Sequence, residues 1–213
     1  MKNLVLYGAG GVGAEIAVLV EDINRIQPTY NLLGFVVDTK YLKEGMYVNG
    51  YPVLGDDKWL LQHKSEVVCC CAIGTPSVRK KIQEMMESYG VTFETLIHPT
   101  VRIHPTTTIG VGTVIAHYCG VSVQVSIGKG CFMNGYSAVG HDVKVGEYSV
   151  IMARCQVSGF SEVGNQVMLG AASFINSHIK IGDEATVVPG SIVFTKVKPS
   201  TYVMGNPAHK VEL

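Results

Sequence analysis

The chain has 213 residues, of which 16% are charged, and its 17 Lys and Arg balance 17 Asp and Glu. This balance argues against a nucleic-acid-binding protein, which needs a basic face, and against a polybasic membrane-binding surface. No segment reaches the roughly 18 uninterrupted apolar residues of a membrane span, and glycines interrupt the apolar N-terminal run where a signal peptide would continue. We therefore expect a cytoplasmic protein that binds small molecules and copies of itself, without nucleic acid and without membrane insertion.

Residues 1–96 alternate apolar strands with helical patterns. The sequence predicts strands in KNLVLY, in LLGFVVD and in EVVCCCAIG, and helices at 14–24, in DDKWLLQH and in PSVRKKIQEMMESYG. Strands that are apolar on both sides and alternate with helices are typical of a small parallel α/β domain.

A glycine loop follows the first predicted strand and opens the first helix. Gly8, Gly10 and Gly13 have the G-x-G-x-x-G spacing, which brings backbone N–H groups and a helix N-terminus to a phosphate. Asp38 follows the second strand, where a carboxylate can meet a ribose hydroxyl. The alternative is that these glycines only permit a tight turn. Because so short a region is half of a two-part dinucleotide fold, we expect a mononucleotide carrying a sugar rather than an oxidoreductase's dinucleotide.

From Ile97 to Val193, every sixth residue is aliphatic or Met, and the residue two positions earlier is small or β-branched. Six is not a helical period, so we predict a parallel β-helix with three short faces and an 18-residue coil. Glycine often follows the aliphatic residue, which we interpret as backbone freedom at a corner. Cys119, Cys131 and Cys155 fit small apolar core positions better than metal or redox sites.

His141 lies two residues after the interior Val139, so its side chain is expected to point outward at a corner. Asp142 follows it, and Gly159 lies one coil further on with an unobstructed backbone N–H. A base beside an oxyanion donor is the arrangement that acyl transfer needs. Two alternatives are a solvated corner histidine and a zinc site, although zinc needs three converging imidazoles, which the spacing of the histidines does not favour.

Several motifs together carry a family resemblance: YGAGGVG, VVD, CAIG, VRKKI, LIHP, the unbroken hexads, the GNPA ending, and a run that contains Asn134, Gly140, His141, Asp142 and Gly146. Over nearly its whole length the chain resembles bacterial sugar acyltransferases of the PglD/NeuD type. The resemblance implies a Rossmann-like nucleotide-sugar-binding domain at 1–96. It implies a left-handed β-helix acyltransferase domain with a C-terminal tail at 97–213, assembled as a homotrimer.

The resemblance also implies roles for individual residues. His141 would be the general base, Asp142 would hold its ring and favour the protonated imidazole, and Gly159 N–H would stabilise the oxyanion. Acetyl-CoA would lie in a groove between adjacent prisms and touch the backbone near Val150, Ala171 and Pro189, with Gly170 beside them. The nucleotide sugar would contact Gly10, Gly11, Val12, Asp38, Gly74, Thr75 and Asn134. No metal is implied.

The chain departs from some relatives at two positions, with Asp142 in place of Glu and Val12 in place of a second histidine. Pro189 has no N–H, so it can contact a cofactor only through its carbonyl or ring. The implied function is acetyl-CoA-dependent N-acetylation of a UDP- or GDP-linked 4-amino-deoxysugar by direct transfer, in cell-surface polysaccharide biosynthesis. O-acetylation of sialic acid is the alternative, and a non-catalytic nucleotide-sugar-binding protein is a remote one.

Overall fold

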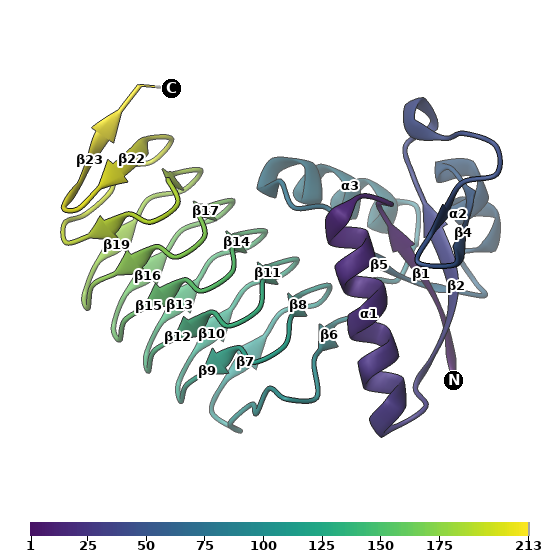
Figure 1. The fold of residues 1–213 in the computed structure, drawn as a ribbon, viewed down its shortest axis with the longest axis horizontal. Coiled ribbons are helices and arrows are strands. Elements are labelled where there is room, and N and C mark those ends of the chain that lie inside the picture. Colours follow the sequence, from purple (N-terminus) through teal and green to yellow (C-terminus); the bar gives the residue numbers. More distant parts are fainter. Residues whose placement is uncertain (213) are drawn as a thin grey trace.

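A computed structural model describes residues 1–212, which form an α/β domain and a three-sided prism packed side by side (Figure 1). Leu213, the last residue of the expected C-terminal domain, lies outside the described residues. No helix in the described part of the chain has the length and apolar character needed to cross a membrane.

The α/β domain contains a five-stranded sheet in the order β3-β4-β2-β1-β5. Its elements are β1 (Lys2–Tyr7), α1 (Gly11–Ile26), β2 (Tyr30–Val36), a 3-10 turn (Thr39–Tyr41), β3 (Tyr47–Val48), β4 (Tyr51–Gly55), α2 (Asp57–His63), β5 (Val68–Cys71) and α3 (Pro76–Ser88). The predicted strands and helices are all present. The sequence reading missed the β3–β4 hairpin, although its Asn49-Gly50 turn is a strong hairpin signal.

The prism is a left-handed parallel β-helix whose strands stack into three sheets. The domain-facing face comprises β6 (Leu96–Ile97), β8 (Val114–Ile115), β11 (Phe132–Met133), β14 (Val150–Ile151), β17 (Met168–Leu169), β20 (Thr186–Val187), β22 (Tyr202–Gly205) and β23 (Ala208–Val211). The charged face comprises β7 (Thr108–Ile109), β10 (Ser126–Ile127), β13 (Lys144–Val145), β16 (Glu162–Val163) and β19 (Lys180–Ile181). The third face, which we call the small-residue face after Gly120 and Ala138 in its first two strands, comprises β9 (Gly120–Val121), β12 (Ala138–Val139), β15 (Gln156–Val157), β18 (Phe174–Ile175) and β21 (Ile192–Val193).

The predicted six-residue rhythm is confirmed by the register of these sheets. Strands pair in parallel with the strand 18 residues away, as in Ser126 with Lys144 and Ala138 with Gln156. The aliphatic residues of the repeat fill one continuous core along the prism axis. All six cysteines are buried and free, as expected for apolar packing positions.

The interpretation of the corner glycines needs correction. The left-handed backbone conformation falls two residues after these glycines, on residues such as Asp142, Tyr148 and Gln166, whose φ angles are 58°, 57° and 54°. A Cβ on Gly140 would lie 2.7 Å from the backbone nitrogen of Gly159 in the next coil. Glycine is therefore required by the close stacking of coils, and not by an unusual φ angle.

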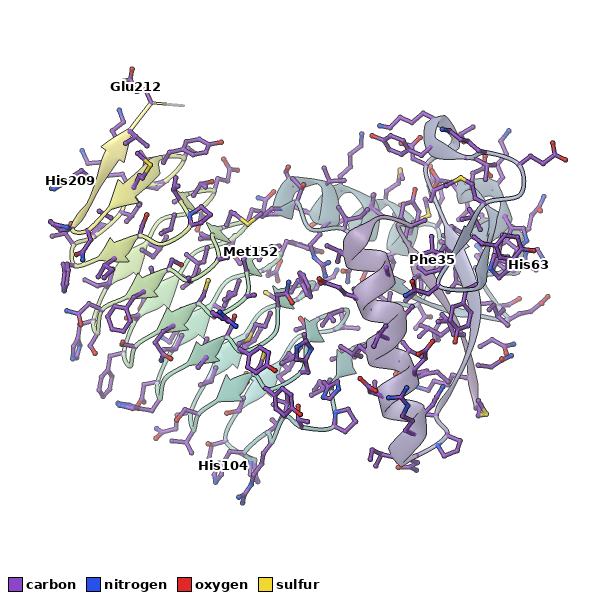
Figure 2. All side chains as sticks on the ribbon, viewed as in Figure 1. Phe35, His63, His104, Met152, His209 and Glu212 are labelled. Atoms are coloured by element: carbon purple, nitrogen blue, oxygen red, sulfur yellow. The ribbon has the colours of Figure 1, made fainter. Side chains whose placement is uncertain are left out.

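The two units share a buried interface, with α1 lying between the sheet and the prism (Figure 1). Apolar residues of α1 and of one sheet face form a single cluster with Val114, Phe132 and Val150 of the prism. Met152 packs against both this cluster and the prism core, and Figure 2 shows it between the units. On the other face of the sheet, α2 and α3 enclose a separate cluster.

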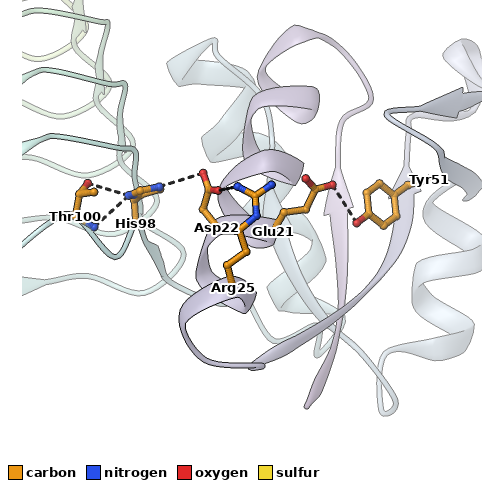
Figure 3. A network of polar contacts seen from close by, with 6 residues as sticks. All are labelled: Glu21, Asp22, Arg25, Tyr51, His98 and Thr100. Atoms are coloured by element: carbon orange, nitrogen blue, oxygen red, sulfur yellow. Dashed lines mark hydrogen bonds and ion pairs between the residues drawn. The ribbon is translucent and has the colours of Figure 1, made fainter.

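A polar contact joins the units beside the apolar cluster (Figure 3). His98, at the start of the prism, is 8% exposed. Its Nε2 lies 3.2 Å from a carboxylate oxygen of Asp22 on α1, and its Nδ1 lies 2.8 Å from the Thr100 hydroxyl. Arg25 bonds the other oxygen of Asp22 at 2.7 Å. The prism therefore begins from a fixed orientation relative to α1.

Candidate active site

The prism presents His141 at the corner between the small-residue face and the charged face, which we call the histidine corner (140–142 and 158–160). Its side chain is 53% exposed, and its Nδ1 lies 2.9 Å from Oδ2 of Asp142. Asp142 adopts a positive φ, a conformation that Asp tolerates better than most residues. With an Nδ1–H donated to the carboxylate, Nε2 is the nitrogen left to accept a proton.

Gly159 lies directly beneath the His141 ring in the next coil. A Cβ on Gly159 would lie 2.8 Å from both Cε1 and Nε2 of His141, so only glycine leaves room for this ring position. Among residues 1–212, the Gly159 N–H donates to no acceptor. The imidazole nitrogen thus lies next to a residue with an unused backbone donor, an arrangement that suits a carbonyl under attack.

Aromatic rings confine the imidazole on its other side. Phe160 meets the His141 ring edge to face, with ring centroids 4.8 Å apart. His178, in the following coil, stacks on Phe160 with centroids also 4.8 Å apart. This column restricts the rotation of an otherwise exposed imidazole, which suits a base that must be placed accurately.

A second histidine makes the same contact at the next corner, between the domain-facing and small-residue faces, which we call the aromatic corner (116–118 and 134–136). His117 covers Gly135, whose Cβ would lie 2.7 Å from its Nε2. Here, however, the glycine N–H donates to Oδ1 of Asn134 at 2.7 Å, and the residue after the histidine is Tyr118. Of these two corners, the one at His141 combines a carboxylate with an unused N–H.

The α/β domain carries a pocket of about 500 Å³ at the ends of β1, β2 and β5. The helices α1 and α3 both begin at this pocket. The N-cap residues Gly10 and Thr75 make no side-chain capping bond, and neither first turn contains an acidic residue. Two uncapped helix N-termini supply free N–H groups and positive dipole ends, a combination that favours a diphosphate.

Comparison with known proteins shows what this chain is similar to. Residues 3–86 match the PglD N-terminal domain. The GDP-perosamine N-acetyltransferase of Escherichia coli O157:H7 is 28% identical over 203 residues, which cover 94% of this chain and 81% of the relative. The chain is homologous to this GDP-perosamine N-acetyltransferase over most of its length.

Solved structures agree with this assignment. The acetyltransferase domain of PglB from Neisseria gonorrhoeae FA1090 superposes with a TM-score of 0.89 at 25% identity, covering 99% of this chain and 100% of that one. That domain has also been solved in complex with acetyl coenzyme A. WeeI from Acinetobacter baumannii AYE gives a TM-score of 0.85 at 25% identity, covering 99% of this chain and 100% of that one.

The structure brings together most of the residues that the PglD resemblance assigned to the nucleotide. Gly10, Gly11, Val12, Asp38 and Gly74 all line the pocket, and Thr75 borders it as the N-cap of α3. Asp38 accepts the Lys40 backbone N–H at 3.1 Å, and chiefly for this reason its pKa is held below its ordinary value. The carboxylate is therefore ionised and suited to accepting hydrogen bonds from a ribose or a base.

Asn134 does not join that pocket or the histidine corner. It lines a smaller cavity of about 190 Å³ between α1 and the prism. Its Oδ1 accepts the Gly135 N–H, and its Nδ2 lies 3.5 Å from a carboxylate oxygen of Glu15. In one chain, Asn134 thus holds the aromatic corner rather than contacting the same space as His141.

The cofactor assignments divide in a similar way. The side chain of Val150 is fully buried in the cluster between α1 and the prism, so a cofactor contact there would have to use the backbone, as the resemblance implies. Gly170, Ala171 and Pro189 stack along the extension of the aromatic corner, with Pro189 exposed. They lie along a different edge of the prism from His141.

Among the residues that line this pocket, sequence reasoning missed Tyr7, Lys40, Tyr41 and Met46, whose side chains are polar, aromatic or long. Tyr7 is the last residue of β1, and its hydroxyl donates a hydrogen bond to the Asp57 carboxylate. Burial raises the pKa of the Tyr7 phenol. Lys40 lies over the Tyr41 ring, 4.8 Å from its centroid, in the turn that follows Asp38. A Lys-Tyr pair two residues after the acidic residue was the available signal, because a turn at a strand end faces the glycine loop.

Proposed function

We propose that this chain transfers the acetyl group of acetyl-CoA to the amine of a nucleotide-linked 4-amino sugar, with His141 as the general base. The observation that carries the proposal is the His141 imidazole, with Nδ1 bonded to Asp142 and Nε2 over Gly159. The E. coli relative is named for an N-acetyltransferase of GDP-perosamine, and the gonococcal domain has been solved with acetyl coenzyme A.

In the proposed reaction, the neutral amine attacks the thioester carbonyl carbon, and the carbonyl electron pair moves to oxygen. The Gly159 N–H donates to that oxyanion while Nε2 of His141 takes the proton from the nitrogen. The carbon–sulfur bond then breaks, and the electron pair leaves with the CoA sulfur, which accepts a proton. The oxyanion electron pair re-forms the carbonyl as this bond breaks, and the imidazolium of His141, whose charge Asp142 offsets, supplies the proton to sulfur. Because the amine attacks the thioester directly, no covalent enzyme intermediate is needed.

The nucleotide is proposed to bind in the pocket of the α/β domain. Its diphosphate would accept hydrogen bonds at the N-termini of α1 and α3, which no side chain caps. Asp38 and Tyr41 line the same pocket and are suited to a ribose hydroxyl and to stacking on a base. In this scheme the enzyme acts in the cytoplasm on precursors of cell-surface polysaccharides.

The active enzyme is proposed to be a homotrimer. Ala171 and Pro189 lie along one prism edge and His141 along another, so a cofactor that reaches both needs a groove between two copies. The small-residue face between these edges is suited to contact with a neighbour because its outward residues are uncharged: Gly120, Ala138, Gln156, Phe174 and Ile192. Light scattering on the purified chain is expected to give the mass of a trimer.

Mass detection of acetylated product tests the function. Acetyl-CoA is incubated with UDP- and GDP-linked 4-amino sugars and, separately, with sialic acid. Acetylation of one amino-sugar nucleotide supports the proposal and names the nucleotide. Acetylation of sialic acid alone would replace it with O-acetylation, and the absence of any product with bound nucleotide sugar would indicate a binding protein.

A further inference from the structure

Arg79, in the VRKKI motif on α3, is fully buried between the α/β domain and the prism. Its guanidinium makes four hydrogen bonds, and among residues 1–212 every acceptor is a backbone carbonyl and none is a carboxylate. The group also lies 5.7 Å from the centroid of the Phe132 ring. A buried charge is strongly unfavourable unless its donors all have acceptors. The four carbonyls must therefore stay in place around the Arg79 guanidinium.

The four carbonyls come from two separate places. Nη1 donates to Cys71 at 2.9 Å and to Ile73 at 2.7 Å, in the loop that connects β5 to α3. Nε donates to Gly130 at 2.9 Å and Nη2 donates to Cys131 at 3.3 Å, in the prism coil that also carries His141. The Arg79 side chain therefore links the β5–α3 loop, which lines the nucleotide pocket, to the β-helix.

The bond to Ile73 also fixes the direction of the next backbone donor. In a trans peptide the C=O and N–H groups point to opposite sides. Because the Ile73 carbonyl points at Arg79, the Gly74 N–H points away from it, and Gly74 lines the nucleotide pocket. Within residues 1–212 this N–H has no acceptor. Gly74 also faces the glycine loop, since its Cβ would lie 3.3 Å from a methyl group of Val12.

We propose that Arg79 is a positioning residue that sets the Gly74 N–H toward the diphosphate of the bound nucleotide and holds the loop 72–75 at a fixed place against the prism. This inference rests on the proposed function, because it assumes that the pocket takes a nucleoside diphosphate. Lysine keeps the charge at this position but has one nitrogen, which cannot reach carbonyls on both sides as a guanidinium does.

The test compares Arg79→Lys and Arg79→Met with Lys129→Met. Lys129 pairs with Glu87 near the C-terminal end of α3, so its replacement breaks a contact between the same helix and the prism without touching the pocket loop. The affinities of GDP, UDP and CoA are measured by calorimetry for each variant. Hydrogen exchange of the segment 72–78 provides a readout that needs no ligand.

Both Arg79 variants are expected to bind the preferred nucleoside diphosphate at least tenfold more weakly, to keep the wild-type affinity for CoA, and to exchange the 72–78 amides faster. Lys129→Met is expected to match the wild type in all three measurements. Wild-type nucleotide affinity in a folded Arg79→Lys protein, or an equal loss of CoA affinity, would overturn the positioning role and leave the proposed function intact. If the unmodified chain binds neither GDP nor UDP, both proposals are wrong.

Discussion

The α/β domain and the prism place functional groups by different means. In the prism, the register repeats every 18 residues, and a side chain such as His141 is placed by its position in the repeat. In the α/β domain, strands far apart in sequence pair, as Leu4 does with Val68, and the pocket forms where those strands end. The prism thus places a single side chain by its repeat, whereas in the α/β domain two uncapped helix N-termini begin at one pocket.

The difference extends to the glycines of the two regions. Most glycines of the prism corners lie against the backbone of the next coil, so a methyl group has no room. At Gly10 and Gly11, a methyl group would meet no atom within 4 Å, because these residues border the open pocket. Glycine serves packing in one region and access for a ligand in the other, and substitutions can separate these purposes.

The largest effect is expected for Gly159→Ala. The nearest atoms to its methyl group would belong to the His141 ring, which is exposed and can move, so the fold should persist while the base is displaced. We expect kcat to fall by about 10²–10⁴-fold, the usual contribution of a general base, with little change in melting temperature. Steady-state kinetics and thermal unfolding check both expectations.

Gly135→Ala is the matched control for this substitution, since it displaces His117 in the same way. Its kcat should stay within a few-fold of the wild type. Equal losses from the two glycine variants would contradict the distinction between the two corners.

Gly146→Ala is expected to have the next largest effect, on stability. Its methyl group would lie 2.5 Å from the carbonyl carbon of Gly164 and 2.6 Å from the nitrogen of Asn165, and neither backbone atom can move without separating the coils. Overpacking of this kind costs about 1–3 kcal/mol. Urea unfolding should show the loss, whereas Gly11→Ala should unfold as the wild type does and bind nucleotide more weakly.

Asp142→Asn tests what the negative charge contributes at the histidine corner. Asparagine tolerates the positive φ of 58° and can still accept the Nδ1–H, so only the charge is lost. Hydrogen bonds to charged groups exceed neutral ones by about 1 kcal/mol, which corresponds to a roughly fivefold lower kcat. An unchanged kcat, measured at saturating substrates, would show that the carboxylate only orients the ring.

The smallest effect concerns the cysteines. Burial raises the pKa of Cys70 and Cys131 to about 12 and that of Cys119 to about 11. Because the folded pKa values exceed the ordinary 9.0, the stability linked to these thiols is complete below pH 9 and is lost as the pH rises toward 12. The native chain should not react with a thiol reagent at about pH 8, and its urea midpoint should fall as the pH is raised above about 10.

More of the prism than of the α/β domain could be predicted from the sequence. The six-residue period alone placed the interior residues, the outward His141 and the stacked Gly159, because in a repeat the register follows from counting. The interpretation of the corner glycines was wrong. A sequence does not distinguish a glycine required by a positive φ angle from a glycine required because a methyl group has no room.

Contacts between the two units were not predictable from periodicity. Val150 occupies a regular outward position in the repeat, and only the packing of α1 on that face buries it. Arg79 belongs to a charged helical motif that reads as solvent-exposed, yet it is enclosed by two loops distant in sequence. Such residues depend on how independent elements dock, which one chain's pattern does not encode.

His141 is proposed to remove the proton from the attacking amine. Comparing the turnover of His141→Ala with that of the wild type tests this role directly. Acetylated product is quantified by mass with acetyl-CoA and the amino-sugar nucleotide that the wild type prefers, while CoA and nucleotide affinities are measured separately. We expect unchanged affinities and a kcat lower by about 10²–10⁴-fold. Turnover within a few-fold of the wild type would contradict it and assign the proton transfer to another group.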